Sequence, residues 1–208
     1  MLILFSCTGQ SKPVYVPVPD KDFHKQEINA FKIGSITETR DGNMPPWLRA
    51  FFNGGIAEIE RGISYQNKYL FVVNNEGINI NALLLWADNF TAEYDFAILA
   101  ADRIEKRMIS SASLYPDNEY GLFFATMIKN AHNAEYSGAV KEDTYWVKTK
   151  PNNNDAEIYN IFILLGIDKR TMQSIINNMS EESLHGITLS ADQKNSVNRL
   201  RQNFFTGF

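Results

Sequence analysis

Apolar and polar positions are patterned most clearly between residues 138 and 179. Two stretches there, 140–147 and 158–165, are rich in β-branched and aromatic residues, which favour strands. The Pro, Asn and Asp residues between them, 151–155, favour a turn. Asp168 then precedes apolar residues at helical spacing, where its side chain can cap the first helical turn. The pattern predicts a β-hairpin that leads directly into a helix.

The second strand of this hairpin carries apolar side chains on both faces. Successive residues of a strand point to opposite faces of a sheet. One face receives Tyr159, Ile161, Ile163 and Leu165, and the other receives Ile158, Phe162 and Leu164, with the polar Asn160 among them. Helices that contain Ala100 and Phe124 are expected to cover the first face. The second face needs its own cover, from a helix at Trp47, a helix at Leu200 or a partner molecule.

The remaining elements follow from apolar spacing between Met44 and the C-terminus. They are a helix that opens at Pro45-Pro46 and breaks at Gly54-Gly55, a short helix over 56–65, a strand over 69–73, and helices over 79–89, 92–113, 118–134 and 190–205. Three strands with helices grouped between and after them indicate an α+β domain. We therefore expect a single domain over residues 44–208, with several helices covering a small three-stranded sheet, mixed or antiparallel.

The single cysteine lies in a short apolar stretch at the N-terminus. Leu4, Phe5, Ser6 and Cys7 resemble the lipobox of bacterial lipoproteins, in which the cysteine becomes the lipidated first residue of the mature protein. Residues 1–7 are then a truncated signal peptide and lipobox, and the acyl chains on Cys7 anchor the protein to a membrane. The alternative is a free cysteine in an apolar segment, a residue type that is often buried.

Residues 8–43 are predicted to be a Pro-rich tether. Pro13, Pro17 and Pro19 favour an extended polyproline-II segment that lifts a domain away from its attachment point. A Pro-rich ligand for a recognition module is the alternative.

Composition and motifs point away from catalysis and nucleic acid. The 24 acidic and 20 basic side chains give a net charge of -4, which offers no general attraction to polyanions. No nucleophile elbow, P-loop or zinc-protease motif occurs, and the three histidines are scattered. We expect no enzyme, no catalytic residue, no metal and no cofactor. One ligand platform is conceivable, since aromatic rings can stack on a glycan beside carboxylate acceptors. Its residues are Glu142, Asp143, Tyr145 and Trp146, which a half-exposed strand would also explain.

Several of these segments occur in an order that can be compared with known families. The order is Pro46-Trp47, an alanine-rich helix, a strand with Asp143 and Tyr145-Trp146-Val147, then 158–164 followed by Asp168-Lys169. This order resembles the small bacterial outer-membrane lipoproteins of the twenty-kilodalton type, especially uncharacterised spirochaetal ones, over roughly residues 45 to 180. The resemblance implies an α+β domain on a lipid anchor, with surface, envelope or flagellum-associated roles and no known catalysis.

The predicted function is that of a lipid-anchored protein of the bacterial cell envelope, in the outer membrane or facing the periplasm. It would act through contacts with envelope proteins or with itself. The second prediction is a lipoprotein that binds a small molecule or glycan between its sheet and its helices.

Overall fold

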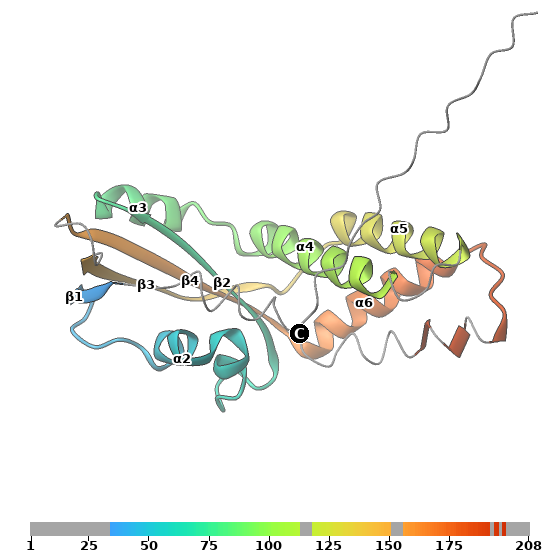
Figure 1. The fold of residues 1–208 in the computed structure, drawn as a ribbon, viewed down its shortest axis with the longest axis horizontal. Helices are drawn as coiled ribbons and strands as arrows, with labels where there is room; N and C mark the ends of the chain where they lie inside the picture. The colour runs from blue at the N-terminus through green and yellow to red at the C-terminus, as the bar shows by residue number, and fades with distance from the viewer. Residues whose placement is uncertain (1–33, 113–117, 151–155, 192–193, 196, 199–208) are drawn as a thin grey trace, which may run out of the picture.

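The structure is a computed structural model that describes residues 34–112, 118–150, 156–191, 194–195 and 197–198. It has an α+β fold (Figure 1). Its elements are, in chain order, β1 (Ser35–Thr39), α2 (Pro46–Glu60), β2 (Lys68–Gly77), α3 (Ile80–Asp88), α4 (Ala92–Ala112), α5 (Asn118–Asn133), β3 (Val140–Lys150), β4 (Ile158–Asp168) and α6 (Lys169–Leu184).

The strands form one antiparallel sheet in the order β1-β3-β4-β2. The predicted hairpin is β3 and β4, and these strands occupy the centre of the sheet. The predicted turn at 151–155 lies outside the described residues. At its C-terminal end, the hairpin leads into α6 as expected, and the Asp168 side chain accepts hydrogen bonds from the backbone N–H groups of Arg170 and Thr171.

The sheet has four strands, so the prediction of three was wrong. The missing strand is β1, which falls within the stretch 8–43 predicted to be a tether. Its sequence has one large apolar residue, Ile36, which is 41% exposed. Backbone pairing with β3 holds this edge strand in place, and such pairing leaves no hydrophobic pattern in the sequence. The folded part of the chain therefore starts at least as early as Ser35 rather than at Met44.

Helices cover both faces of the sheet, α2 on one side and α3 with α4 on the other, while α5 packs against α4 and α6 (Figure 1). The α2 face buries Trp47, Leu48, Phe51, Ile59, Leu70, Tyr145, Val147, Phe162 and Leu164. The opposite face buries Tyr69, Phe71, Ile161, Ile163, Leu165 and Ile167 against residues of α3, α4, α5 and α6, Ala100 and Phe124 among them. The expected division of β4 into two apolar faces is thus confirmed. The second face is covered by the helix at Trp47, while Leu200 lies outside the described residues.

Helix α2 has the predicted break. It starts at Pro46, where the missing N–H of proline has no helical partner to lose. Gly54 and Gly55 leave helical geometry, and Gly55 has φ 68° and ψ -159°. The second half of α2 ends at Glu60 rather than at Tyr65, and two turns follow it. The break lets both halves of the helix lie along the sheet, because Phe51 and Ile59 on either side of it are buried in the same cluster.

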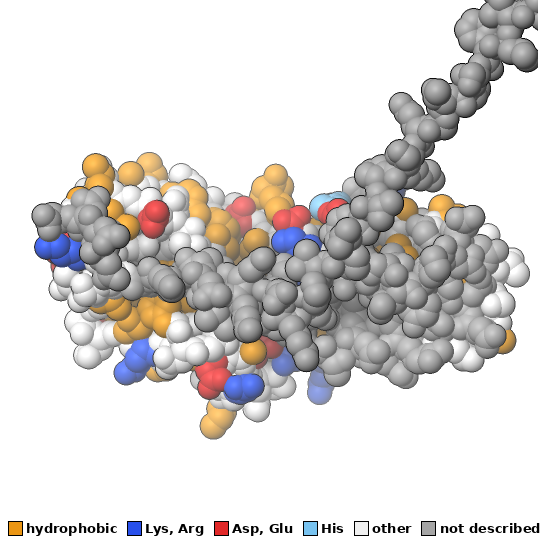
Figure 2. All heavy atoms as spheres, viewed as in Figure 1, with side chains coloured by type: hydrophobic (Ala, Val, Ile, Leu, Met, Phe, Trp, Pro, Cys, Tyr) orange, Lys and Arg blue, Asp and Glu red, His pale blue; other side chains and the backbone are white. Residues whose placement is uncertain are grey.

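Several large apolar side chains lie outside this core. Tyr94 and Ile98, four residues apart on α4, are 68% and 47% exposed, and Leu85 on α3 is 64% exposed. Ile78, just before α3, is 81% exposed. In the space-filling view hydrophobic atoms gather along the upper rim, over α3 and α4 (Figure 2). The described residues include no helix that is both long enough and apolar enough to cross a membrane.

Candidate functional site

A β-bulge in β3 places two consecutive carboxylates on the same face of the sheet. The register with β4 shifts between Lys141 and Asp143. A bulge inserts one extra residue into a strand. The side chains before it therefore point to the opposite face from the one that simple alternation would give. Lys141 accordingly reaches the α3 side, where its amine donates to the carbonyl of Ala87 at 2.5 Å. Glu142 and Asp143 both contact groups on the α2 side, at Lys68 and at Trp47.

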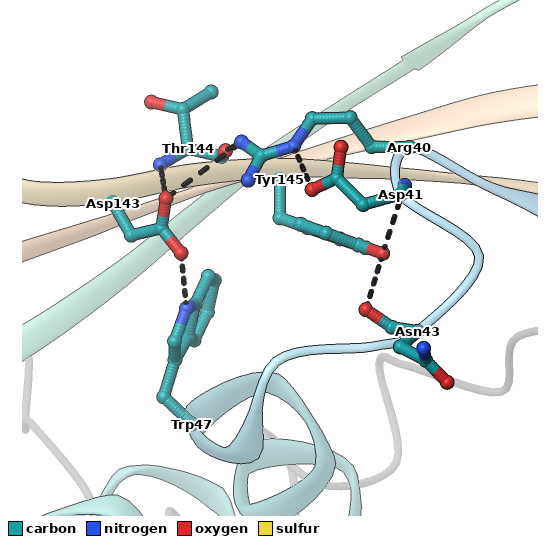
Figure 3. A network of polar contacts seen from close by, with 7 residues as sticks. All are labelled: Arg40, Asp41, Asn43, Trp47, Asp143, Thr144 and Tyr145. Atoms are coloured by element: carbon teal, nitrogen blue, oxygen red, sulfur yellow. Dashed lines mark hydrogen bonds and ion pairs between the residues drawn. The ribbon is translucent and has the colours of Figure 1, made fainter.

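Asp143 is the centre of a polar network between β3 and the segment that leads into α2 (Figure 3). Its Oδ2 accepts a hydrogen bond from the indole Nε1 of Trp47 at 2.8 Å. Its Oδ1 accepts from the backbone N–H of Thr144 at 2.8 Å and lies 3.7 Å from the Arg40 guanidinium. The Asp143 side chain is 30% exposed, so these contacts hold a carboxylate at the border between core and solvent.

Arg40 and Tyr145 complete the network (Figure 3). The Arg40 guanidinium lies 4.7 Å from the centre of the Tyr145 ring, donates to the carbonyl of Thr144 and pairs with Asp41 at 2.7 Å. The Tyr145 hydroxyl donates to the carbonyl of Asn43 at 2.8 Å. These bonds fasten the segment between β1 and α2 onto the middle of β3. The network has the geometry of a structural contact between two segments, since every charged group in it already has a protein partner.

The four residues predicted as a ligand platform are divided between the two faces of the sheet. Tyr145 is 1% exposed beneath α2, and Trp146 packs on the opposite side, with its ring 5.5 Å from that of Tyr159 in an edge-to-face contact. Their rings cannot stack on one ligand, because successive strand residues point in opposite directions. Glu142 and Asp143 do lie together, paired with Lys68 and Trp47.

Sequence reasoning missed the partners of these carboxylates. Trp47 is 96 residues from Asp143 in the chain, and Lys68 is 74 residues from Glu142. One local signal marks the bulge but not these partners: three polar residues, Lys141 to Asp143, interrupt the apolar alternation of β3 there.

Another partly buried carboxyl group lies at the edge of the sheet. Glu60, the last residue of α2, accepts a hydrogen bond from the backbone N–H of Leu70 on β2 at 3.3 Å. Burial raises the pKa of the Glu60 carboxyl, and the cations of Lys169 and Arg103 oppose this shift together with the bond from Leu70. The desolvation of the carboxylate therefore outweighs its favourable contacts.

Other candidate groups do not assemble into a site within the described ranges. There, His, Cys, Asp and Glu side chains form no cluster of three or more able to hold a metal ion. His132 lies 3.3 Å from Glu105, and His185 follows the C-terminus of α6. Cys7, the predicted lipidation site, and His24 lie outside the described residues.

Comparison with family models, with curated proteins and with solved structures found no match to this chain.

Proposed function

We propose that the protein is a lipid-anchored lipoprotein of the bacterial cell envelope that acts through protein contacts and not through catalysis. In this proposal Cys7 carries the acyl chains and the residues after it link the membrane to the folded domain, which begins by Ser35. The domain faces the periplasm or lies at the outer membrane, where it takes part in structure or assembly.

One observation carries the contact part of the proposal. Both faces of the sheet are covered by the chain's own helices, yet Ile78 just before α3, Leu85 on α3 and Tyr94 on α4 remain more than half exposed. Neighbouring exposed apolar side chains are typical of surfaces that bind other proteins. The outer surface of α3 and α4 is therefore the part of the domain best suited to an apolar partner.

Metabolic labelling tests the anchor. Cells that express the chain are grown with labelled palmitate, and the Cys7→Ala variant is compared with a Ser11→Ala control, which leaves the lipobox intact. We expect label in the wild type and in the control but none in Cys7→Ala, because the chain has one cysteine. Equal label in all three proteins, or label in none, would contradict lipidation at Cys7.

Site-specific photo-crosslinking tests the contact surface. A photoreactive residue placed at Tyr94, 68% exposed on α4, is expected to give discrete protein adducts in intact cells. The matched control is Asp102, an exposed polar position on the same helix. Adducts of equal yield at both positions, or none at Tyr94, would count against a contact role for this surface.

A further inference from the structure

In the residues that the structure describes, the outer edge of β2 has backbone groups without a hydrogen-bond partner. In an antiparallel strand, alternate residues direct their N–H and C=O groups to the same side. Leu70 and Glu76 direct theirs away from β4, since the N–H of Leu70 is bonded to Glu60 and that of Glu76 to the side chain of Asn75 at 2.9 Å. The outward residues of β2 are therefore the even-numbered ones.

Two outward residues, Val72 and Asn74, lie between Leu70 and Glu76, whose N–H groups are bonded to side chains. Within the described part of the chain, the N–H groups of these two residues donate no hydrogen bond. Residues 71–75, Phe-Val-Val-Asn-Asn, contain no charge and no proline, and their pairing with β4 is regular. Natural edge strands are usually shortened, bulged or charged to prevent pairing with another chain. The other edge, β1, follows that rule with five residues and a register shift.

We infer that β2 pairs antiparallel with β2 of a second copy, about a two-fold axis at Val73. In this register Val72 of each copy lies opposite Asn74 of the other, and the two residues exchange their main-chain hydrogen bonds. The two Val73 side chains lie opposite each other as an apolar pair. Such an interface is closed, because the two-fold axis pairs the same segment of β2 in both copies. Neither copy then has this segment free to bind a third chain.

The charges at the two ends of β2 favour a second copy as the partner and antiparallel as the direction of pairing. Lys68 and Lys169 lie at the N-terminal end of the strand, with Arg103 close enough to act on Glu60, while Glu76 lies at the C-terminal end. Antiparallel pairing brings the cationic end of one copy beside Glu76 of the other. It also places Glu76 opposite Leu70 and Lys68 opposite Ile78, so that no like charges are directly opposed.

A cysteine crosslink tests the register. Val73→Cys is made in the full-length Cys7→Ser background, so that the new thiol is the one cysteine present. Directly opposed, non-hydrogen-bonded residues have Cα atoms about 4.5 Å apart, which a disulfide spans. The control is Asn75→Cys, because two Asn75 residues would be offset by four positions, about 13 Å. We expect a disulfide-linked dimer from Val73→Cys at several times the yield from the control. Equal yields, or none from Val73→Cys, would overturn the inference.

Sedimentation of the Cys7→Ser protein provides a second measurement. We expect a monomer–dimer equilibrium that Asn74→Pro shifts at least tenfold toward monomer, since proline at an outward edge position removes one intermolecular donor without breaking the pairing with β4. Circular dichroism establishes that the variant is folded. A Cys7→Ser protein that is monomeric at every concentration, or a dimer unaffected by Asn74→Pro, would refute the pairing. This inference goes beyond the proposed function, because the edge of β2 is a different surface from the outside of α3 and α4, and the palmitate experiment tests the anchor separately.

Discussion

The indole of Trp47 donates a hydrogen bond to the carboxylate of Asp143 at 2.8 Å, and this bond joins the first turn of α2 to the bulge of β3. Trp47 is 4% exposed, so water has little access to the indole side of the bond. Asp143 faces α2 by ordinary strand alternation with Tyr145, and the bulge adds Glu142 to the same face. The bond therefore ties the start of the covering helix to the middle strands of the sheet.

Replacing Trp47 by Phe should destabilise the fold, because it removes the donor and leaves one carboxylate oxygen of Asp143 facing an apolar ring. An unsatisfied buried acceptor costs about 1–3 kcal/mol, and the partial exposure of Asp143 places the loss near the lower end. Urea unfolding measures the change. The double variant Trp47→Phe, Asp143→Ala is the matched control, since the second change should add much less in the absence of the indole than in its presence. Additive effects of the two changes would show that the bond contributes nothing.

The backbone conformation of Gly55 is the second feature that the structure of α2 requires. Its φ of 68° and ψ of -159° belong to a region that residues other than glycine avoid, at a cost of about 1–3 kcal/mol. Gly55→Ala should lower the free energy of unfolding by that amount. Gly77→Ala is the control, because an added Cβ there meets Leu83 at an ordinary 3.7 Å and no positive φ is involved. Equal stability of the two variants in urea would contradict the proposed strain.

The sequence predicted those elements whose apolar residues are periodic. The β3–β4 hairpin, α4 and α5 were found nearly to their ends, and the two-sided apolar pattern of β4 correctly required cover on each face. The glycine pair in α2 was also identified, since two adjacent glycines interrupt an otherwise clear helical stripe.

The parts that the sequence did not predict are held by backbone pairing or by contacts distant in the chain. β1 has too few apolar residues to give a pattern, and the polar half of β2, from Asn74 to Gly77, resembled a turn until its pairing with β4 was known. The partners of Asp143 and Glu142 come from α2 and β2, and no local pattern could identify them. The separation of Tyr145 from Trp146 did follow from strand alternation, which the platform hypothesis did not take into account.

The Asp168 cap predicts a local loss of stability. Its carboxylate accepts hydrogen bonds from Arg170 and Thr171 at the start of α6, at 2.8 and 3.3 Å. Asp168→Ala should therefore destabilise the protein by about 1 kcal/mol, while Asp168→Asn, which keeps an acceptor, should change stability by a few tenths. Thermal unfolding compares the two variants. If the Asn variant lost as much as the Ala variant, the acceptor would not be the cause.

Glu60 predicts how stability depends on pH. Burial is the largest influence on this carboxyl and raises its pKa, so the folded state binds the proton more tightly than the unfolded chain does. The free energy that Glu60 contributes to folding is then greatest below its unfolded pKa, near 4.5, and declines as pH rises through the higher folded value.

The Glu60→Gln variant isolates this contribution, because glutamine can still accept the Leu70 N–H but does not titrate over this range. Relative to wild type, the variant should gain stability as pH rises from about 4 to 7. Urea unfolding at a series of pH values measures the difference. Glu58→Gln is the control, since Glu58 lies half a turn away with its side chain 40% exposed and paired with Arg61. A Glu60→Gln variant that loses stability relative to wild type over the same pH range would mean that Lys169 and Arg103 outweigh burial at this site.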